Sequence, residues 1–109
     1  MISTLEKLKC LEAYLAANSS IVDSVLDKSI TKLLAREQMR MQNLIQRLQQ
    51  QISQFEKNYH LVSQEFYTRY NQGKMGDKMD FVEWASTIEM LANAKKRIAL
   101  LDSVNESVD

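Results

Sequence analysis

The chain has 109 residues, with 14 basic and 14 acidic side chains and a formal net charge of zero. This length allows one domain, and the charge balance excludes a global field that would draw the protein to nucleic acid or to an anionic membrane. No long apolar run is present, so we expect no membrane-spanning segment. The N-terminus lacks the basic and apolar segments of an export signal, and the single cysteine, Cys10, cannot form an internal disulfide, so we expect a cytoplasmic location.

The first helix is predicted over residues 4–17. Its apolar stripe consists of leucines at helical spacing: Leu5, Leu8, Leu11 and Leu15. The polar run at 18–20 interrupts it, with Asn18 suited to a left-handed C-terminal position. Ser20 and Asp23 are spaced as a cap for the next helix.

The second helix is predicted over residues 21–59 and is the dominant element. Two apolar series repeat every seven residues, the first at Leu34, Met41, Leu48 and Phe55 and the second at Ile45, Ile52 and Tyr59. A strict seven-residue period keeps one seam facing a partner, as in coiled coils. A helix of this length, roughly 55–60 Å, needs other helices along it. The seven glutamines between residues 38 and 54 are interpreted as a neutral, solvated face.

A short third helix is predicted over residues 64–72. Ser63 is expected to cap it, with Val62 stapled onto Tyr67, and Gly73 is expected to end it in a left-handed conformation. The chain has no proline, and its two glycines, Gly73 and Gly76, fall within four positions. They therefore mark the main turn of the chain.

The fourth helix is predicted over residues 80–102, followed by a frayed polar tail at 103–109. Asp80 and Glu83 are spaced as a capping box, and Met79 is expected to staple onto Trp84. Its predicted seam is Phe81, Trp84, Ile88, Leu91 and Ile98, with Lys95 as a polar lapse. Three alanines beside that seam are expected to let two helix axes approach closely: Ala85, Ala92 and Ala99.

The predicted fold is therefore all-α, a single helical domain over 1–102. It is a long, coiled-coil-like helical hairpin with a short helix and a glycine turn at the tip. The fourth helix should return antiparallel along the second, from Tyr59 back to about Gln38. The first helix should cover the other end, up to about Arg36. Two antiparallel helices bury only one stripe each, so we expect a homodimer.

Candidate chemistry is sparse. Asp77, Asp80 and Glu83 form an acidic cluster, but capping and the helix dipole already explain carboxylates in a first helical turn. His60 is interpreted as a hinge residue, and Cys10 has no histidine nearby in sequence to activate it. We expect no enzymatic activity, no metal site and no cofactor.

Nucleic-acid binding is not expected either. Arg36, Arg40 and Arg47 are basic, but Glu37 and the glutamines dilute them, and no helix-turn-helix pattern is present.

The apolar residues instead indicate protein–protein binding. Methionines gather near the glycine turn and the seam; flexible methionines suit an adaptable binding surface, but core filling is their more common role. The aromatic residues near the glycines could anchor a partner or plug the tip of the hairpin, and we favour the plug. The predicted partner or dimer interface consists of Leu34, Met41, Leu48, Ile52, Phe55, Tyr67, Tyr70, Phe81, Trp84, Ile88 and Leu91.

Four stretches carry a resemblance to a known group of proteins. They are Phe55-Glu56-Lys57-Asn58-Tyr59, Ser63-Gln64-Glu65-Phe66-Tyr67, Gly73 to Gly76-Asp77, and Asp80-Phe81-Val82-Glu83-Trp84. The pattern FExxY…SxEFY…GxxGDxxDFxEW resembles that of small helical proteins from cyanobacteria and archaea, over about half of the chain. The last part, GxxGDxxDFxEW, is its most specific portion. This sequence departs from the pattern at His60, where glycine is usual, so the turn geometry could differ.

The resemblance implies a function. Proteins of this group resemble the antitoxin half of toxin–antitoxin pairs, whose partner would be a small ribonuclease-like toxin. We therefore expect a protein-binding module that neutralises a toxin by masking it, through the helical arm or the tip. The alternative is a homodimeric scaffold coiled coil with no hetero-partner, in which homodimerisation consumes all the apolar stripes.

Overall fold

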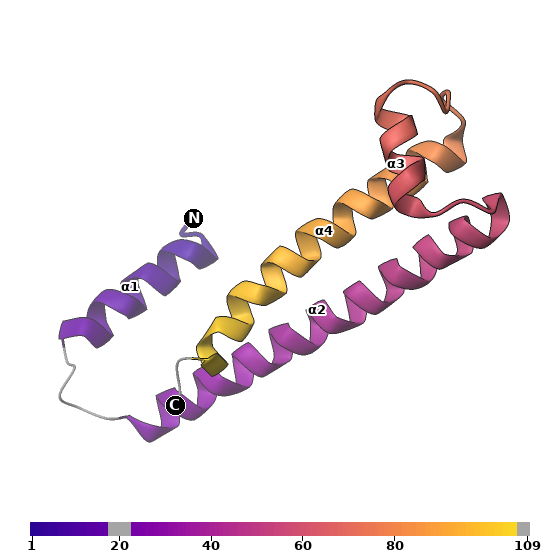
Figure 1. The fold of residues 1–109 in the computed structure, drawn as a ribbon. Coiled ribbons are helices and arrows are strands. Elements are labelled where there is room, and N and C mark those ends of the chain that lie inside the picture. Colours follow the sequence, from indigo (N-terminus) through magenta and orange to yellow (C-terminus); the bar gives the residue numbers. More distant parts are fainter. Residues whose placement is uncertain (18–22, 107–109) are drawn as a thin grey trace. The chain divides into compact units, whose positions relative to one another are not determined.

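The computed structural model describes residues 1–17 and 23–106. All regular structure in these ranges is helical, which confirms the all-α prediction (Figure 1). The helices are α1 (Thr4–Ala17), α2 (Ser24–Tyr59), α3 (Ser63–Asn71) and α4 (Met79–Glu106). The chain divides into two compact units, residues 1–32 and 33–109, and each is described by itself. The single domain over 1–102 stays a prediction, as does the placement of the first helix along the second.

The unit of residues 1–32 contains α1 and the first turns of α2. Ser3 caps α1, because its Oγ accepts a hydrogen bond from the Glu6 amide at 3.1 Å. Asp23 caps α2 in the same way, accepting from the amides of Val25 and Leu26 at 3.0 and 3.1 Å. The predicted roles of Asn18 and Ser20 lie outside the described residues. Within those residues α2 begins at Ser24, and the predicted start at 21 also lies outside them.

A left-handed residue ends α2. His60 has φ +51°, and the Leu61 amide donates to the Glu56 carbonyl at 3.3 Å, six residues back counting both ends. This pairing is the Schellman motif, which favours glycine at the position that His60 occupies. His60 therefore adopts a conformation that glycine would adopt more easily.

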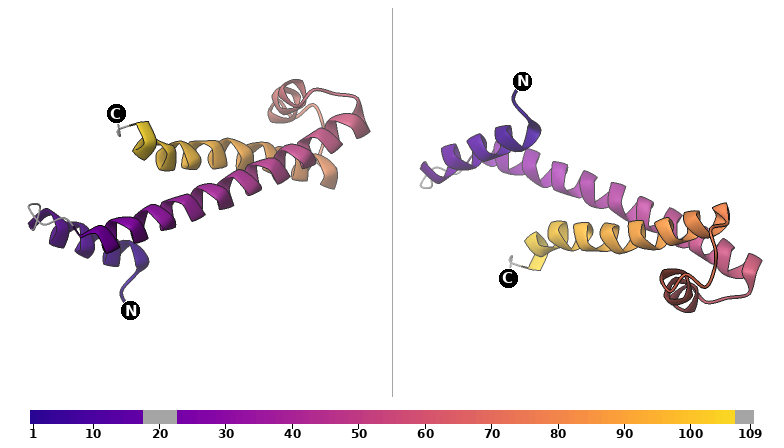
Figure 2. Two further views of the ribbon diagram at one scale, coloured as in Figure 1. Left: turned by 90° about the horizontal axis from the view of Figure 1, so that it is seen from below. Right: turned by 90° about the horizontal axis from the view of Figure 1, so that it is seen from above.

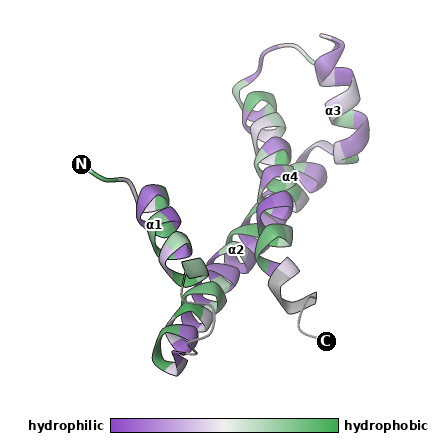
Figure 3. Ribbon diagram, turned by 90° about the vertical axis from the view of Figure 1, so that its left-hand side faces the viewer, coloured by the Kyte–Doolittle hydropathy of each residue, from purple (hydrophilic) through white to green (hydrophobic). Residues whose placement is uncertain are grey.

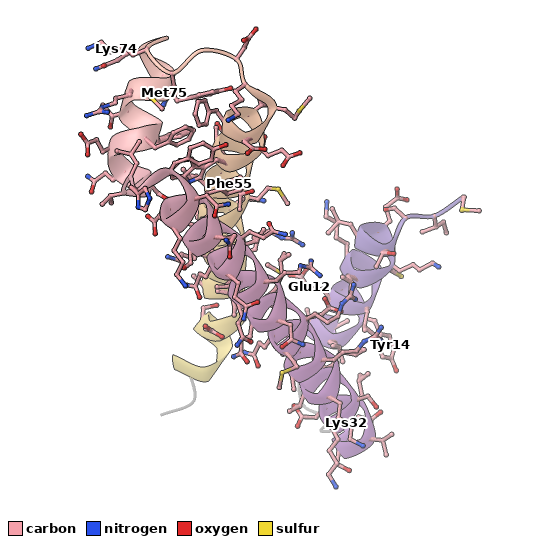
Figure 4. All side chains as sticks on the ribbon, turned by 90° about the vertical axis from the view of Figure 1, so that its right-hand side faces the viewer. Glu12, Tyr14, Lys32, Phe55, Lys74 and Met75 are labelled. Carbon is pink, nitrogen blue, oxygen red and sulfur yellow. The ribbon has the colours of Figure 1, made fainter. Side chains whose placement is uncertain are left out.

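The same motif ends α3, and here the sequence prediction is confirmed. Gly73 has φ +74°, its amide donates to the Tyr70 carbonyl at 3.0 Å, and the Lys74 amide donates to the Arg69 carbonyl at 2.9 Å. The chain then crosses to α4 through a loop that contains Gly76, also at positive φ, and Met75 (Figure 4).

The predicted N-caps of α3 and α4 are wrong. Val62, not Ser63, occupies the cap of α3, and it is exposed rather than stapled onto Tyr67. The Ser63 amide instead donates to Glu56 Oε2 at 2.8 Å. A tertiary carboxylate therefore replaces the local cap, which no local pattern encodes.

At the other end of the loop, α4 begins at Met79, one residue earlier than predicted. Met79 is exposed and does not staple onto Trp84. Asp80 accepts a hydrogen bond from the Tyr59 hydroxyl. The last helix also continues to Glu106, four residues past its predicted end, because no glycine or proline follows to stop it.

Within the unit of residues 33–109, α2 and α4 form the predicted antiparallel hairpin (Figure 2). The Gln38 amide nitrogen donates to the Leu101 carbonyl at 3.3 Å and to Asp102 Oδ1 at 3.2 Å. The return helix therefore covers α2 back to Gln38, as the length of the two helices predicts. Between these ends, Met41, Leu48 and Ala94 are buried together.

The five residues of the predicted α4 seam all pack into the core: Trp84 is buried, and Phe81, Ile88, Leu91 and Ile98 are half-buried. Thr87 and Ala94 are buried, whereas Lys95 is exposed and Ile88 only half-buried. Among the three flanking alanines, Ala85 is buried but Ala92 and Ala99 are exposed. The small side chain buried against Met41 and Leu48 of α2 is Ala94, rather than the predicted Ala92 or Ala99.

Candidate functional site

None of the eleven predicted interface residues is exposed in the single chain. Met41, Leu48 and Trp84 are buried, and the other eight are half-buried. Most of them gather in two clusters, one along the hairpin and one at its tip, built on Met41–Leu48–Ala94 and on Phe66–Trp84–Ala85. The chain therefore uses these side chains first for its own packing, while their role in an interface stays a prediction.

The tip cluster packs α3 onto α4. The rings of Phe66 and Trp84 are stacked with centroids 3.8 Å apart, and both side chains are fully covered. The Trp84 indole Nε1 donates to Ser63 Oγ at 3.0 Å, so its one polar atom is satisfied. Phe55 of α2 also stacks on Trp84, with ring centroids 5.6 Å apart. Trp84 thus plugs the tip and presents no surface to a partner in this conformation.

A hydrogen bond closes the tip between α2 and α4. The Tyr59 hydroxyl donates to Asp80 Oδ2 at 2.5 Å, and the Lys78 ammonium lies 4.9 Å from the centre of the Tyr59 ring. Hydrogen bonding to Tyr59 is the main cause that raises the pKa of Lys78 above its usual value. Asp80 therefore accepts a hydrogen bond from another helix, and this residue of the acidic cluster has a structural role.

A second hydrogen bond ties α3 to α4. The Tyr67 hydroxyl donates to Glu89 Oε1 at 2.8 Å. This bond to the Glu89 carboxylate is the main cause that raises the pKa of Tyr67 above its usual value. Together with the Phe66–Trp84 stack, it places α3 against one side of α4.

A groove runs between α2 and α4 and has a volume of about 520 Å³ near the tip. Apolar side chains contribute to its wall, among them Phe55, Val82 and Met90. Its polar lining comes from both helices: Gln51, Gln54, Asn58, Glu83, Ser86 and Thr87. The groove presents a mixed surface with hydrogen-bonding groups beside apolar ones.

Farther from the tip, the same two helices line a basic hollow of about 380 Å³. Met41 and Leu44 contribute apolar surface there. Three arginines from two helices converge on it, Arg40, Arg47 and Arg97, and the one acid in the lining is Glu37. Glu37 forms an ion pair with Arg40 at 3.2 Å. The hollow therefore has an excess of positive charge.

The leucine stripe of α1 is largely exposed. No residue of this helix is buried, and Leu5 and Leu8 each leave more than half of their surface exposed. Leu15 is also exposed, and Leu11 is half-buried. Coloured by hydropathy, α1 shows apolar residues interleaved with polar ones (Figure 3). This helix presents an apolar stripe that its own unit does not bury.

The residue types associated with catalysis do not converge in the described part of the chain. Within residues 1–17 and 23–106, no group of three histidine, cysteine or acidic side chains could hold a metal ion. Cys10 is exposed, and His60 serves the turn described above. No helix within these ranges is long and apolar enough to cross a membrane. The absence of enzymatic activity stays a prediction.

The exposure of four apolar residues of α4 was not predicted from the sequence. They are Met79, Val82, Met90 and Leu100. A signal for them exists in the sequence, since Met79 and Leu100 belong to one seven-residue series and Met90 to another. The apolar series through Trp84 and Leu91 is stronger, and the prediction followed that series instead.

No known protein family, curated protein or solved structure matches this chain. Its function must therefore be argued from its own residues and geometry.

Proposed function

We propose that this chain is a protein-binding helical module that acts as an antitoxin, neutralising a small ribonuclease-like toxin by covering it. The observation that carries the proposal is the exposed leucine stripe of α1, at Leu5, Leu8 and Leu15. The resemblance of residues 55–84 to antitoxin-like helical proteins supports the same class of function.

The length of α1 strengthens the argument. Isolated helices shorter than roughly 12–15 residues are marginal in water, and α1 has 14 residues without one buried side chain. Packing of an apolar face normally supplies the missing stability. A partner protein that receives the leucine stripe would supply it here, by the helix-in-groove mode of recognition.

The tip of the hairpin is a less suitable binding site. Its aromatic side chains are covered by the chain's own α3 and α2, as the burial of Phe66 and Trp84 records. We therefore assign toxin binding to α1 rather than to the glycine-turn tip.

The test is co-expression with the protein encoded next to this chain, scored by relief of growth arrest and by direct binding of the purified proteins. Leu8→Asp is expected to abolish both, because a buried charge in an apolar interface is strongly unfavourable. Leu33→Asp is the matched control, since Leu33 and Leu8 are 55% and 56% exposed. Binding and rescue that survive Leu8→Asp would refute α1 as the contact, and absence of any binding would refute the antitoxin function.

A homodimeric scaffold with no hetero-partner is the second candidate. The burial of Met41, Leu48 and Trp84 within a single chain favours it, because these seams then need no other protein. A chain that elutes only with copies of itself, and for which α1 substitutions have no effect, would support the scaffold.

A further inference from the structure

One exposed face of α4 carries a self-complementary series of residues. Glu83, Met90 and Arg97 are seven residues apart, so they lie on one face of the helix at intervals of about 10 Å. All three are exposed, and Met90 is 52% exposed. The sequence of properties along this face is acidic, apolar, basic.

These three residues face the groove between α2 and α4 in its two parts. Glu83 and Met90 line the part near the tip, beside Phe55 and Val82. Arg97 lines the basic hollow farther along, together with Arg40 and Arg47. One end of the groove thus carries an acid beside apolar residues, and the other end carries an excess of arginine.

The groove is open because α3 packs elsewhere on α4. On α4, the α3 side chains contact Phe81, Trp84 and Glu89, and none of these three lines the groove. Along residues 33–103 the groove is therefore flanked by two helices alone. Such a surface has the shape that a third helix fills in a bundle.

We propose that a second copy of this chain docks in the groove, antiparallel to the first, with the two-fold axis close to Met90. In this arrangement Met90 of one copy packs on Met90 of the other. A residue seven positions before Met90 then faces the residue seven positions after it in the partner copy. Glu83 of each copy consequently enters the arginine hollow of the other, beside Arg97.

The order of charges along α4 favours a second copy of this chain as the occupant of the groove. A two-fold axis uses the same patch on both copies, so an interface of this kind must be complementary to itself. The acidic–apolar–basic order of Glu83, Met90 and Arg97 meets that condition only when the two helices run in opposite directions. A parallel pair would place Arg97 beside Arg97 and Glu83 beside Glu83, which is repulsive.

This inference does not depend on toxin binding, since α1 takes no part in the contact. The first test is sedimentation of the full chain over about 1 to 100 μM, a range that brackets micromolar affinity. We expect a species of twice the chain's 12.6 kDa. A chain that stays monomeric throughout would overturn the proposal and leave the groove to another protein.

The contact itself is tested by Met90→Glu, which sets two carboxylates against each other at the axis. Its dissociation constant should rise at least tenfold, with helical circular dichroism unchanged. Met39→Glu is the matched control, because Met39 is 57% exposed and does not line the groove. Should Met90→Glu fail to fold, Glu83→Arg tests the same contact through charge. A dimer unaffected by either change would overturn the proposed interface.

Orientation is tested by disulfide trapping with Cys10 replaced by serine. Ser86 lies four residues before Met90 and Asn93 three residues after it, so in an antiparallel pair they are nearly level. Co-expressed Ser86→Cys and Asn93→Cys chains should cross-link to each other. Cross-linking of each variant to itself alone would show a parallel pair and overturn the proposal.

Discussion

His60 holds a backbone conformation that is costly for a residue with a Cβ atom. Its φ of +51° belongs to the left-handed region, where the penalty is about 1 kcal/mol relative to glycine. We expect His60→Gly to stabilise the protein by about 0.5–1 kcal/mol, after allowance for the greater freedom of glycine in the unfolded chain. Urea denaturation should show a higher midpoint with an unchanged slope.

Gly73 provides the converse test, because it holds a similar conformation at φ +74° with no atom near its missing Cβ. Gly73→Ala should therefore destabilise the protein by about 1 kcal/mol through backbone strain alone. Equal stabilities of the alanine variant and the parent would show that the turn does not require a left-handed residue.

The hydrogen bond donated by the Tyr67 hydroxyl makes the stability of the protein depend on pH. Its hydroxyl must keep its proton to donate to Glu89, and its pKa is raised above the usual value of about 10. The contribution of this bond is fully present below about pH 10 and is lost as the pH rises through the higher pKa of the folded state. Tyr67→Phe should remove a transition above about pH 10 from an absorbance titration of the tyrosines. Loss of a transition at or below about pH 10 instead would contradict the hydrogen bond from Tyr67 to Glu89.

At the scale of the element, the contact between α2 and α4 depends on a small side chain. Ala94 is 1% exposed and packs with Met41 and Leu48. Ala94→Leu should overpack this contact and cost about 1–3 kcal/mol in the free energy of unfolding. Ala99→Leu, at an exposed position of the same helix, should change it by less than about 0.5 kcal/mol. A larger loss of stability for Ala99→Leu than for Ala94→Leu would instead place Ala99 at the contact, as the sequence pattern predicts.

At the scale of the whole molecule, the division into two units predicts independent folding. Residues 33–109 contain both buried clusters, whereas α1 has no buried residue. A chain lacking residues 1–32 should therefore unfold cooperatively with a midpoint within a few degrees of the parent, since a loss of 1 kcal/mol shifts it by roughly 4–8 °C. Loss of cooperative unfolding would favour the single domain expected from length.

Much of the fold follows from the sequence because its determinants are local. The glycine at Gly73, the missing prolines and the seven-residue series through Met41 and Leu48 each act within a few turns of helix. They predict four helices, their order, the antiparallel hairpin and the reach of α4 back to Gln38. Local chemistry suffices for these features, since helix periodicity and breakers do not depend on distant residues.

The remaining features were decided by tertiary structure. Ser63 and Asp80 look like caps in sequence, yet Trp84 and Tyr59 engage them through hydrogen bonds that span 21 positions. The burial of Ala94 rather than Lys95 depends on how α2 and α4 meet, and the exposure of Met90 depends on which side α3 covers. The sequence by itself therefore determined the helices and their pairing, whereas only packing decided which faces remain open to other proteins. Burial is a property of elements in contact, and no local pattern encodes it.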